Sequence, residues 1–388
     1  MISSPITDIM LESTTRNDRP FIGLSVRAGA WIVVPRARRM SCDGLAIYNP
    51  QRLKGLLAKA LVQHGLWSPP TVYLRDDVVS EIEAVLADCL NHKSVSCAFY
   101  FRSPGLFSKT IILALDGNGH AVAYAKLGST AESNKAVTHE GDVLERLARV
   151  PSLAGRIPHV IARTAWRNFP MLLLSVGPSR RPPRAFGAAH HDFLRHLKIA
   201  TLDRMPLVNS LMWKTISARH SAVENSLEPS WANRYKWALT EVGERVGRGA
   251  LELNLAHRDF VPWNMRRGED NTLFVFDWEL AQKQCTPGWD FFHYHLAGRL
   301  LRAIRIGRSD VVQLLQNAEC RGIVPADGYF LAYLVDVGLF LHDRLLRSPA
   351  TQENGFLKLV ESAIESFRRG KERKPAVPAA ALARGISG

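Results

Sequence analysis

The spacing of apolar and polar positions changes along the chain, from a strand-rich stretch to a mainly helical one. Short apolar runs rich in β-branched and aromatic residues predict strands over 96–101, 109–115 and 120–127. Between the last two, Asp116-Gly117-Asn118-Gly119 favours a tight hairpin, because glycine and asparagine tolerate the positive φ that such turns need. A further apolar run predicts a strand over 170–176.

Apolar residues at helical spacing predict helices before, within and after these strands. Residues 1–44 place six arginines around one short apolar run and are predicted to form a basic arm with little regular structure. The segment 368–388 is rich in alanine, proline, glycine and basic residues and is predicted to be a disordered tail. The predicted helices span 50–67, 76–90, 135–150, 188–201, 230–248, 309–317, 329–346 and 355–369.

The order of these elements predicts four parts and an α+β fold class. An N-terminal extension over 1–94 combines the basic arm with two helices. A small β-rich lobe with a linking strand follows over 95–176, then a larger, mainly helical lobe over 177–367 and the tail over 368–388. Two lobes with a crevice between them are a common way to hold a ligand.

Composition is that of an ordinary globular protein, with 46% hydrophobic and 22% charged residues among 388. It excludes a wholly disordered chain, a collagen-like chain and a coiled coil. Five scattered cysteines without a C-x-x-C pair argue against a disulfide framework and a zinc site. Because the chain lacks both a run of about 18 uncharged apolar residues and a secretory-type N-terminus, we expect no membrane-spanning helix and a cytoplasmic location.

The candidate chemistry lies in Ala256-His257-Arg258-Asp259-Phe260-Val261-Pro262-Trp263-Asn264 and in Phe274-Val275-Phe276-Asp277-Trp278-Glu279. Asp259 and Asn264 lie in a loop interrupted by Pro262, and Asp277 closes a short apolar strand. Two carboxylates and an amide on such a loop–strand–loop unit can converge on one point. Mg²⁺ takes oxygen ligands of this kind together with phosphate oxygens and water.

Phosphoryl transfer needs a metal on the phosphates, a group that orients the acceptor hydroxyl and a cation on the remaining phosphate charge. Asp259 can orient the hydroxyl or accept its proton, while Asn264 and Asp277 hold the metal. Lys126 in the strand 120–127 can supply the cation. Glu140, fourteen residues later in the next predicted helix, can pair with Lys126 and hold it in place.

The pattern H-R-D-x-x-x-x-N followed by an apolar strand and Asp resembles the protein kinase-like superfamily. The surrounding D-F-x-P-W-N and F-D-W-E, with Pro287-Gly288-Trp289-Asp290 downstream, resemble its aminoglycoside phosphotransferase and choline kinase branch over about residues 95–350. The resemblance implies a bilobal kinase-like fold and the ATP- and Mg²⁺-dependent transfer of a γ-phosphoryl group to a small-molecule hydroxyl.

The resemblance also implies roles for individual residues. Asp259 would be the catalytic base, Asn264 and Asp277 the Mg²⁺ ligands, and Lys126 the contact to the α- and β-phosphates, held by Glu140. Leu174, Ser175 and Val176 would form the hinge whose backbone pairs with adenine. Two features depart from the branch: Arg258 stands where a small residue is usual, and the loop 103–108 has one glycine in place of G-x-G-x-x-G.

The net charge of +14 bears on the partners of the protein. It favours anionic partners and suits a polycationic aminoglycoside poorly unless the acceptor cleft is locally acidic. A sugar, an anionic glycan or lipid precursor, or an amino alcohol therefore stays open as the acceptor, as does an aminoglycoside-like compound. Two other functions also stay open: a non-catalytic nucleotide-binding protein of the same fold, and a basic protein that binds anionic surfaces through its arm and tail.

No zinc finger, helix-turn-helix or RNA-binding motif is present, so no specific nucleic acid is expected as a partner. Contact with the surface of an anionic membrane stays open. The pattern does not distinguish ATP from GTP and indicates no oligomeric state.

Overall fold

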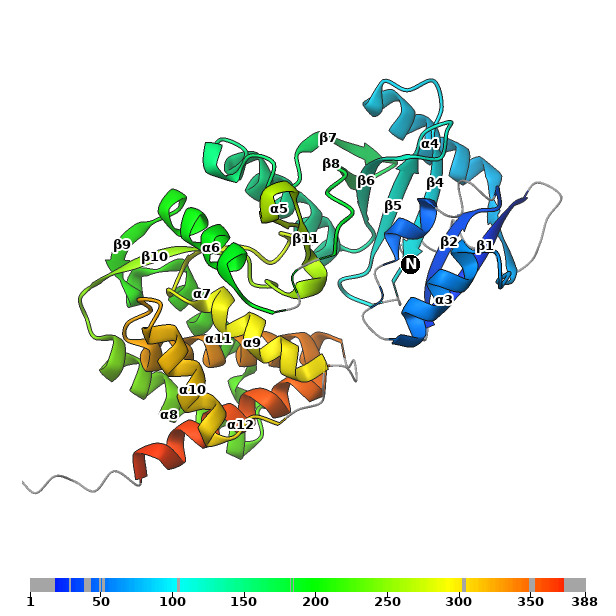
Figure 1. Ribbon diagram of the computed structural model, residues 1–388. Coiled ribbons are helices and arrows are strands. Elements are labelled where there is room, and N and C mark those ends of the chain that lie inside the picture. The colour runs from blue at the N-terminus through cyan, green and yellow to red at the C-terminus, as the bar shows by residue number, and fades with distance from the viewer. Residues whose placement is uncertain are drawn as a thin grey trace, which may run out of the picture. The chain divides into compact units, whose positions relative to one another are not determined.

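The computed structural model describes residues 18–27, 29–37, 43–48, 50, 53–102, 105–181, 183, 185–301, 305–348 and 353–372. The chain forms two compact units (Figure 1). The first unit comprises Met1–Thr201 and His257–Ala281, and the second comprises Leu202–Ala256 and Gln282–Gly388. This grouping differs from the predicted lobes over 95–176 and 177–367, because the loop with Asp259 and the strand before Asp277 belong to the β-rich unit.

The described part of the first unit is built on an eight-stranded sheet with the order β3-β1-β2-β4-β5-β6-β8-β7, in which neighbouring strands are antiparallel. The four predicted strands are confirmed to within one residue at each end. The hairpin is confirmed as well, with hydrogen bonds from Gly119 N to Asp116 O and from Asp116 N to His120 O, both of 2.9 Å. The strands are β1 (Asp18–Arg27), β2 (Ala30–Pro35), β3 (Thr71–Arg75), β4 (Ser96–Phe101), β5 (Lys109–Leu115), β6 (Ala121–Gly128), β7 (Val160–Trp166) and β8 (Phe169–Ser175).

The prediction of a basic arm is wrong for the described residues between 18 and 37, which form β1 and β2. Apolar residues in these strands pack on both faces of the sheet: Phe21 lies on one face and Leu24 on the other. The charge of Arg19 does not oppose this, because its guanidinium contacts Asp76 and Glu83, each at 2.6 Å. Residues 1–17, 28 and 38–42 of the predicted arm lie outside the described residues.

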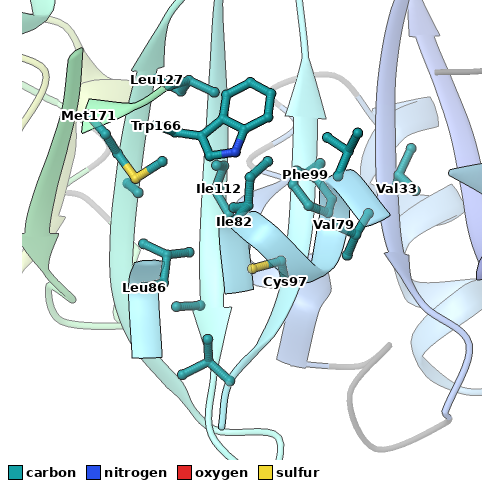
Figure 2. Packing of buried hydrophobic residues seen from close by; sticks show 14 of the residues in the cluster. Val33, Val79, Ile82, Leu86, Cys97, Phe99, Ile112, Leu127, Trp166 and Met171 are labelled. Atoms are coloured by element: carbon teal, nitrogen blue, oxygen red, sulfur yellow. The ribbon is translucent and has the colours of Figure 1, made fainter. Parts of the chain in front are cut away.

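One face of the sheet, here called the apolar face, packs against helix α4 (Asp76–Leu90). Figure 2 shows Val79, Ile82 and Leu86 of α4 beside side chains of the strands, among them Phe99 and Ile112. The labelled residues belong to one buried cluster, and α4 confirms the predicted helix over 76–90. Burial of such side chains, at roughly 25 cal/mol per Å², stabilises this side of the sheet.

The opposite face, here called the lysine face, carries the alternate residues of the same strands. Leu113 of β5 and Tyr124 of β6 pack there with Leu45 of the short helix η1 (Leu45–Ile47) and Val62 of helix α3 (Leu53–Gln63). Lys109 and Lys126 share this face, because side chains two residues apart on a strand point the same way.

Two predicted helices differ from the structure at their ends. Helix α3 ends at Gln63, short of the predicted residue 67, because Gly65 adopts a positive φ of 71° that stops the helix. Helix α5 (Ala131–Leu147) begins earlier than the predicted residue 135, because the Thr130 hydroxyl accepts a hydrogen bond of 3.0 Å from Ser133 N. Residues 49, 51 and 52 lie outside the described residues.

The first unit ends with a short segment that positions the candidate site. The helix η5 (Pro262–Asn264) leads into a hairpin of β11 (Met265–Arg267) and β12 (Leu273–Val275), with Met265 opposite Val275. The unit also contains the short helices η2 (Pro151–Leu153) and η6 (Glu269–Asn271) and helix α6 (Ala188–Ala200), which confirms the predicted helix over 188–201.

The second unit is mainly helical, and the predicted helices over 230–248, 309–317, 329–346 and 355–369 are confirmed as α8, α10, α11 and α12. Helix α11 is buried along most of its length and packs against α7, α8 and α12. The described elements of the second unit are β9 (Asp203–Pro206), η3 (Leu207–Asn209), α7 (Leu211–Val223), η4 (Glu224–Ser226), α8 (Pro229–Val246), β10 (Ala250–Ala256), β13 (Gln282–Cys285), α9 (Trp289–Leu301), α10 (Arg308–Glu319), α11 (Ala326–Arg347) and α12 (Glu353–Glu372).

Helix α12 corrects the predicted start of the tail. It continues to Glu372, so residues 368–372 are helical, since no proline interrupts the helix before Pro375. Residues 373–388 lie outside the described residues. Among the described helices, none combines the length and the apolar composition needed to cross a membrane.

Candidate active site

The loop that carries Asp259 is held by a buried histidine. His257 Nδ1 accepts a hydrogen bond of 3.2 Å from Asp259 N, and His257 Nε2 lies 3.0 Å from the carbonyl oxygen of Phe276. Because a carbonyl oxygen only accepts, this geometry assigns the ring proton to Nε2. Arg258, at φ 66°, turns the backbone between His257 and Asp259. His257 therefore ties the loop to the residue before Asp277.

Asn264 positions the Asp259 carboxylate. Its Nδ2 donates hydrogen bonds to Asp259 Oδ2 at 2.7 Å and to Asp259 O at 3.1 Å. The turn η5 with Pro262 at its start brings the two residues together across five positions. Since the amide nitrogen faces Asp259, the amide oxygen of Asn264 is the atom of this side chain that could ligate a cation.

Asp277 follows directly from the hairpin of β11 and β12. The Phe276 N–H donates a hydrogen bond of 3.0 Å to Asn264 O, which extends the hairpin and brings Asn264 beside the backbone before Asp277. Asp277 itself has a φ of 69°, a left-handed conformation that aspartate tolerates better than most residues. The next residue, Trp278, is fully buried and donates from its backbone N–H to Glu140 Oε1 at 3.0 Å.

Lys126 lies between two carboxylates. Its Nζ is 2.7 and 2.6 Å from the two oxygens of Glu140 and 2.5 Å from Asp277 Oδ1. The Glu140 side chain has no exposed surface, and Asp277 is 17% exposed. A buried charge without a partner is costly, so these contacts are what allow the lysine and Glu140 to be charged inside the unit.

Burial and charge act in opposite directions on the pKa values of these groups. Burial lowers the pKa of Lys126, but Asp277 and Glu140 outweigh it and hold that pKa above its usual value. For Asp277 burial raises the pKa, whereas Lys109, Lys126 and Arg102 together hold it well below its usual range. Burial also raises the pKa of Glu140, against the charge of Lys126. Asp277 is thus an ionised carboxylate surrounded by cations.

The sequence matches no model of a known protein family and no curated protein sequence. Solved structures do match the fold. The aminoglycoside phosphotransferase APH(4)-Ia superposes with a TM-score of 0.50 at 14% identity, over 74% of this chain and 98% of that one. This chain has a protein kinase-like fold.

Two other solved structures show weaker likeness. The GDP complex of aminoglycoside 2'-phosphotransferase-IIIa has a TM-score of 0.47 at 14% identity, over 76% of this chain and 99% of that one. Choline kinase LicA from Streptococcus pneumoniae has a TM-score of 0.44 at 13% identity, over 67% of this chain and 89% of that one. The superposition on APH(4)-Ia confirms the predicted kinase-like fold of the α+β class.

The predicted hinge of this kinase-like fold lies at the end of β8. Leu174 and Ser175 pair with Tyr124 and Ala123 of β6, and Ser175 N donates a hydrogen bond of 2.9 Å to His159 O. The backbone N–H of Ser175 is thus already engaged. Val176, which follows β8 and is 37% exposed, is the predicted hinge residue with the most accessible surface.

The sequence argument missed three residues that contribute charge to the site. Lys109 contacts Asp277 Oδ1 at 3.3 Å and also contacts Glu279. The charge of Arg102 helps to lower the pKa of Asp277. The sequence did offer a signal for Lys109, because this residue begins the predicted strand that forms a hairpin with the strand of Lys126. Glu279 stood inside the quoted motif without a role.

Carboxylate oxygens of Glu140, Asp277 and Glu279 lie within 4.8 Å of one another. Carboxylate oxygens are the kind of donor that Mg²⁺ takes, and of the two predicted ligands, Asn264 and Asp277, this cluster contains Asp277.

The loop between β4 and β5 is tied to the residues before α5. The Thr130 hydroxyl donates a hydrogen bond to Leu106 O and the Ser129 hydroxyl donates one to Ser108 O, both of 2.5 Å. Ser103 and Pro104 of the predicted phosphate loop lie outside the described residues. The described residues of the loop, 105–108, are thus held by two hydroxyl groups.

Proposed function

We propose that this protein is an ATP- and Mg²⁺-dependent phosphotransferase that moves the γ-phosphoryl group to a hydroxyl of a small molecule. One observation carries the proposal: a single ammonium group, that of Lys126, contacts both the buried Glu140 and the carboxylate of Asp277. A cation for the phosphates and a carboxylate for a metal thus lie within one hydrogen bond of each other. The fold, shared with a solved phosphotransferase, supports the same reaction class.

Asp277 and the amide oxygen of Asn264 are the proposed ligands of Mg²⁺, with Glu279 as a further carboxylate close by. Mg²⁺ would neutralise the phosphate charge that grows during transfer. Lys126, held by Glu140, would contact the α- and β-phosphates. The backbone of Leu174, Ser175 and Val176 is the proposed place of the adenine, with Val176 the residue best placed to pair.

Asp259 is the proposed catalytic base. Its carboxylate keeps one oxygen in a hydrogen bond with Asn264 Nδ2, which fixes its orientation. The other oxygen can accept the proton of the acceptor hydroxyl as the new O–P bond forms and the bond to the leaving ADP breaks. Because catalysis of this kind depends on positioning, the His257 and Asn264 contacts that orient the base contribute to it as well.

The acceptor is proposed to be a hydroxyl compound without strong positive charge. The net charge of +14 disfavours a polycation and favours an anionic glycan or lipid precursor, with a sugar and an amino alcohol as further candidates. The cysteines that the structure describes are free, which suits the expected cytoplasmic location. Neither argument selects one acceptor, so nucleotide binding is the first property to test.

The test compares two aspartates of the same segment by calorimetry with MgATP. Asp277 and Asp270 both adopt a positive φ, of 69° and 52°, so asparagine suits each backbone equally. Wild type and the matched control Asp270→Asn, at an exposed turn, are expected to bind with micromolar affinity. Asp277→Asn should lose at least about 100-fold, since loss of an outer-shell partner already costs roughly 10- to 100-fold.

Two results would count against the proposal. Equal binding of MgATP by wild type and Asp277→Asn, or binding that does not need Mg²⁺, would place the nucleotide elsewhere. Absence of binding by a folded wild type would favour the non-catalytic protein of the same fold.

A further inference from the structure

A second buried lysine lies in the candidate site and has no part in the proposed reaction so far. Lys109 is the first residue of β5, and its side chain is 1% exposed. Its ammonium contacts the carboxylates of Asp277 and Glu279. A lysine buried this deeply needs such anionic partners to keep its charge, so its contacts with the two carboxylates are part of the structure of the site.

The ammonium groups of Lys109 and Lys126 both contact one atom, Asp277 Oδ1. They lie on adjacent strands, with Lys126 opposite Ile111 in the ladder of β5 and β6. Asp277 Oδ1 is 3.3 Å from the first ammonium and 2.5 Å from the second. One oxygen of Asp277, a proposed metal ligand, is therefore already shared by two cations.

A divalent ion and these ammonium groups compete for the same oxygens. Mg²⁺ binds carboxylate oxygens at 2.0–2.1 Å, and at that distance the ion and a neighbouring ammonium repel each other inside a low-dielectric site. The ammonium has to find another anion before the ion can bind well. Nucleotide phosphates are the anions that the proposed function brings to this place.

Of the two lysines, Lys109 is the one free to exchange its partner. Lys126 is held by both oxygens of Glu140, which is fully buried and further fixed by Trp278 N. The partners of Lys109 are Asp277 and Glu279, which are 17% and 18% exposed and thus reachable from solvent.

We infer that Lys109 is a positioning residue that occupies the carboxylates of Asp277 and Glu279 until a nucleotide arrives, so that divalent metal and nucleotide bind cooperatively. The inference rests on the proposed function, because the nucleotide phosphates are what release the lysine. Coupling of this kind is reciprocal: the factor by which nucleotide tightens the metal is the factor by which metal tightens the nucleotide.

The test measures Mn²⁺ binding by electron paramagnetic resonance, with and without saturating ADP. Wild type should bind Mn²⁺ weakly alone and at least about tenfold more tightly with ADP, within the usual range of coupling between sites. Lys109→Met should bind Mn²⁺ alone at least about tenfold more tightly than wild type, and its gain from ADP should shrink by a similar factor. Lys109→Arg, which keeps the charge, should stay close to wild type.

The control is Lys93→Met, an exposed lysine in the connection between α4 and β4, which should behave as wild type. Lys109→Gln replaces Lys109→Met if circular dichroism shows that the latter does not fold. Equal Mn²⁺ affinity of wild type and the folded charge-removing variant overturns the inference, as does tight Mn²⁺ binding by wild type alone. If ADP does not bind at all, the proposed function fails, while the measurement with Mn²⁺ alone still decides the role of Lys109.

Discussion

The two faces of the eight-stranded sheet are made by the same strands and differ in what they bury. On the apolar face, Phe99, Ile112 and their neighbours form a hydrophobic cluster with residues of α4. On the lysine face, Lys109 and Lys126 stand beside a second apolar cluster and contact carboxylates. Side chains alternate along a strand, so one strand can stabilise the fold on one side and carry charge on the other.

The two faces also differ in where their partners come from. Helix α4 directly precedes β4, so the apolar face is covered by a neighbour in sequence. The lysine face recruits Glu140, 14 residues from Lys126, and then Asp277 and Glu279, which lie 151 and 170 residues from the lysines they contact. The helix that covers the apolar face is therefore adjacent in sequence to one of the strands it covers, whereas two of the carboxylates of the charged site come from a distant segment.

Removal of Lys126 should break this arrangement most severely. Lys126→Met leaves Glu140 buried without its cation, and loss of one partner of a buried pair costs about 3–5 kcal/mol in the free energy of unfolding. Urea unfolding measures this loss. The double variant Lys126→Met/Glu140→Gln should be more stable than Lys126→Met, because it removes the uncompensated charge.

Lys93→Met is the matched control, since an exposed lysine away from such contacts changes stability by about 0.5 kcal/mol or less. A Lys126→Met protein as stable as this control would mean that the ion pair contributes little to folding.

Substitutions on the apolar face should lower the stability of the protein without changing its affinity for nucleotide. Ile112→Ala removes a fully buried side chain and is expected to lower the free energy of unfolding by about 2–5 kcal/mol, with Ile112→Val losing about 0.5–1.5. MgATP affinity, measured by calorimetry at a temperature where the variants are folded, should stay within about twofold of wild type, because the Ile112 side chain lies in the cluster on the face opposite Lys126. A nucleotide affinity that falls in step with stability would contradict the separation of the two faces.

How far the sequence could predict the structure follows the same division. Elements with local signals were predicted closely: β4 and β5 at their observed ends, and the hairpin from Asp116 to Gly119. Strands β1 and β2 were missed because arginines surround their apolar residues. Arg19 is neutralised by Asp76 and Glu83, which lie more than fifty residues further along the chain.

The candidate site was predicted where a motif keeps residues in order and missed where only the fold brings them together. Asp259, Asn264 and Asp277 stand in one motif, and Lys126 with Glu140 follows from the spacing of a strand and the next helix. Lys109 and Glu279 carry no such spacing, since 170 residues separate them. Their contact depends on the register of β5 against β6 and on the turn after Asp277, which a single sequence does not reveal.

Lys59 of α3, whose helix packs on the lysine face, offers the smallest and most specific test, because its surroundings are the reverse of those of Lys126. Burial, together with the charges of Arg266 and Arg181, lowers the pKa of Lys59 to about 8 from a usual value near 10.5. Between these two pH values the folded protein has lost the Lys59 proton that the unfolded chain still holds. Unfolding therefore takes up a proton, and rising pH should stabilise the folded state.

Urea unfolding at pH 7.5 and 9.5 should show wild type gaining stability relative to Lys59→Met as the pH rises. The gain should be about 1 kcal/mol or less, because the side chain is partly solvated and its interactions are screened. Lys54→Met, at an exposed position of the same helix, should show no such pH dependence. If wild type showed no gain relative to Lys59→Met over this range, the pKa of Lys59 would not be lowered in the folded state. The contrast between Lys126, held by carboxylates, and Lys59, bonded to the backbone carbonyl of Tyr48, would then disappear.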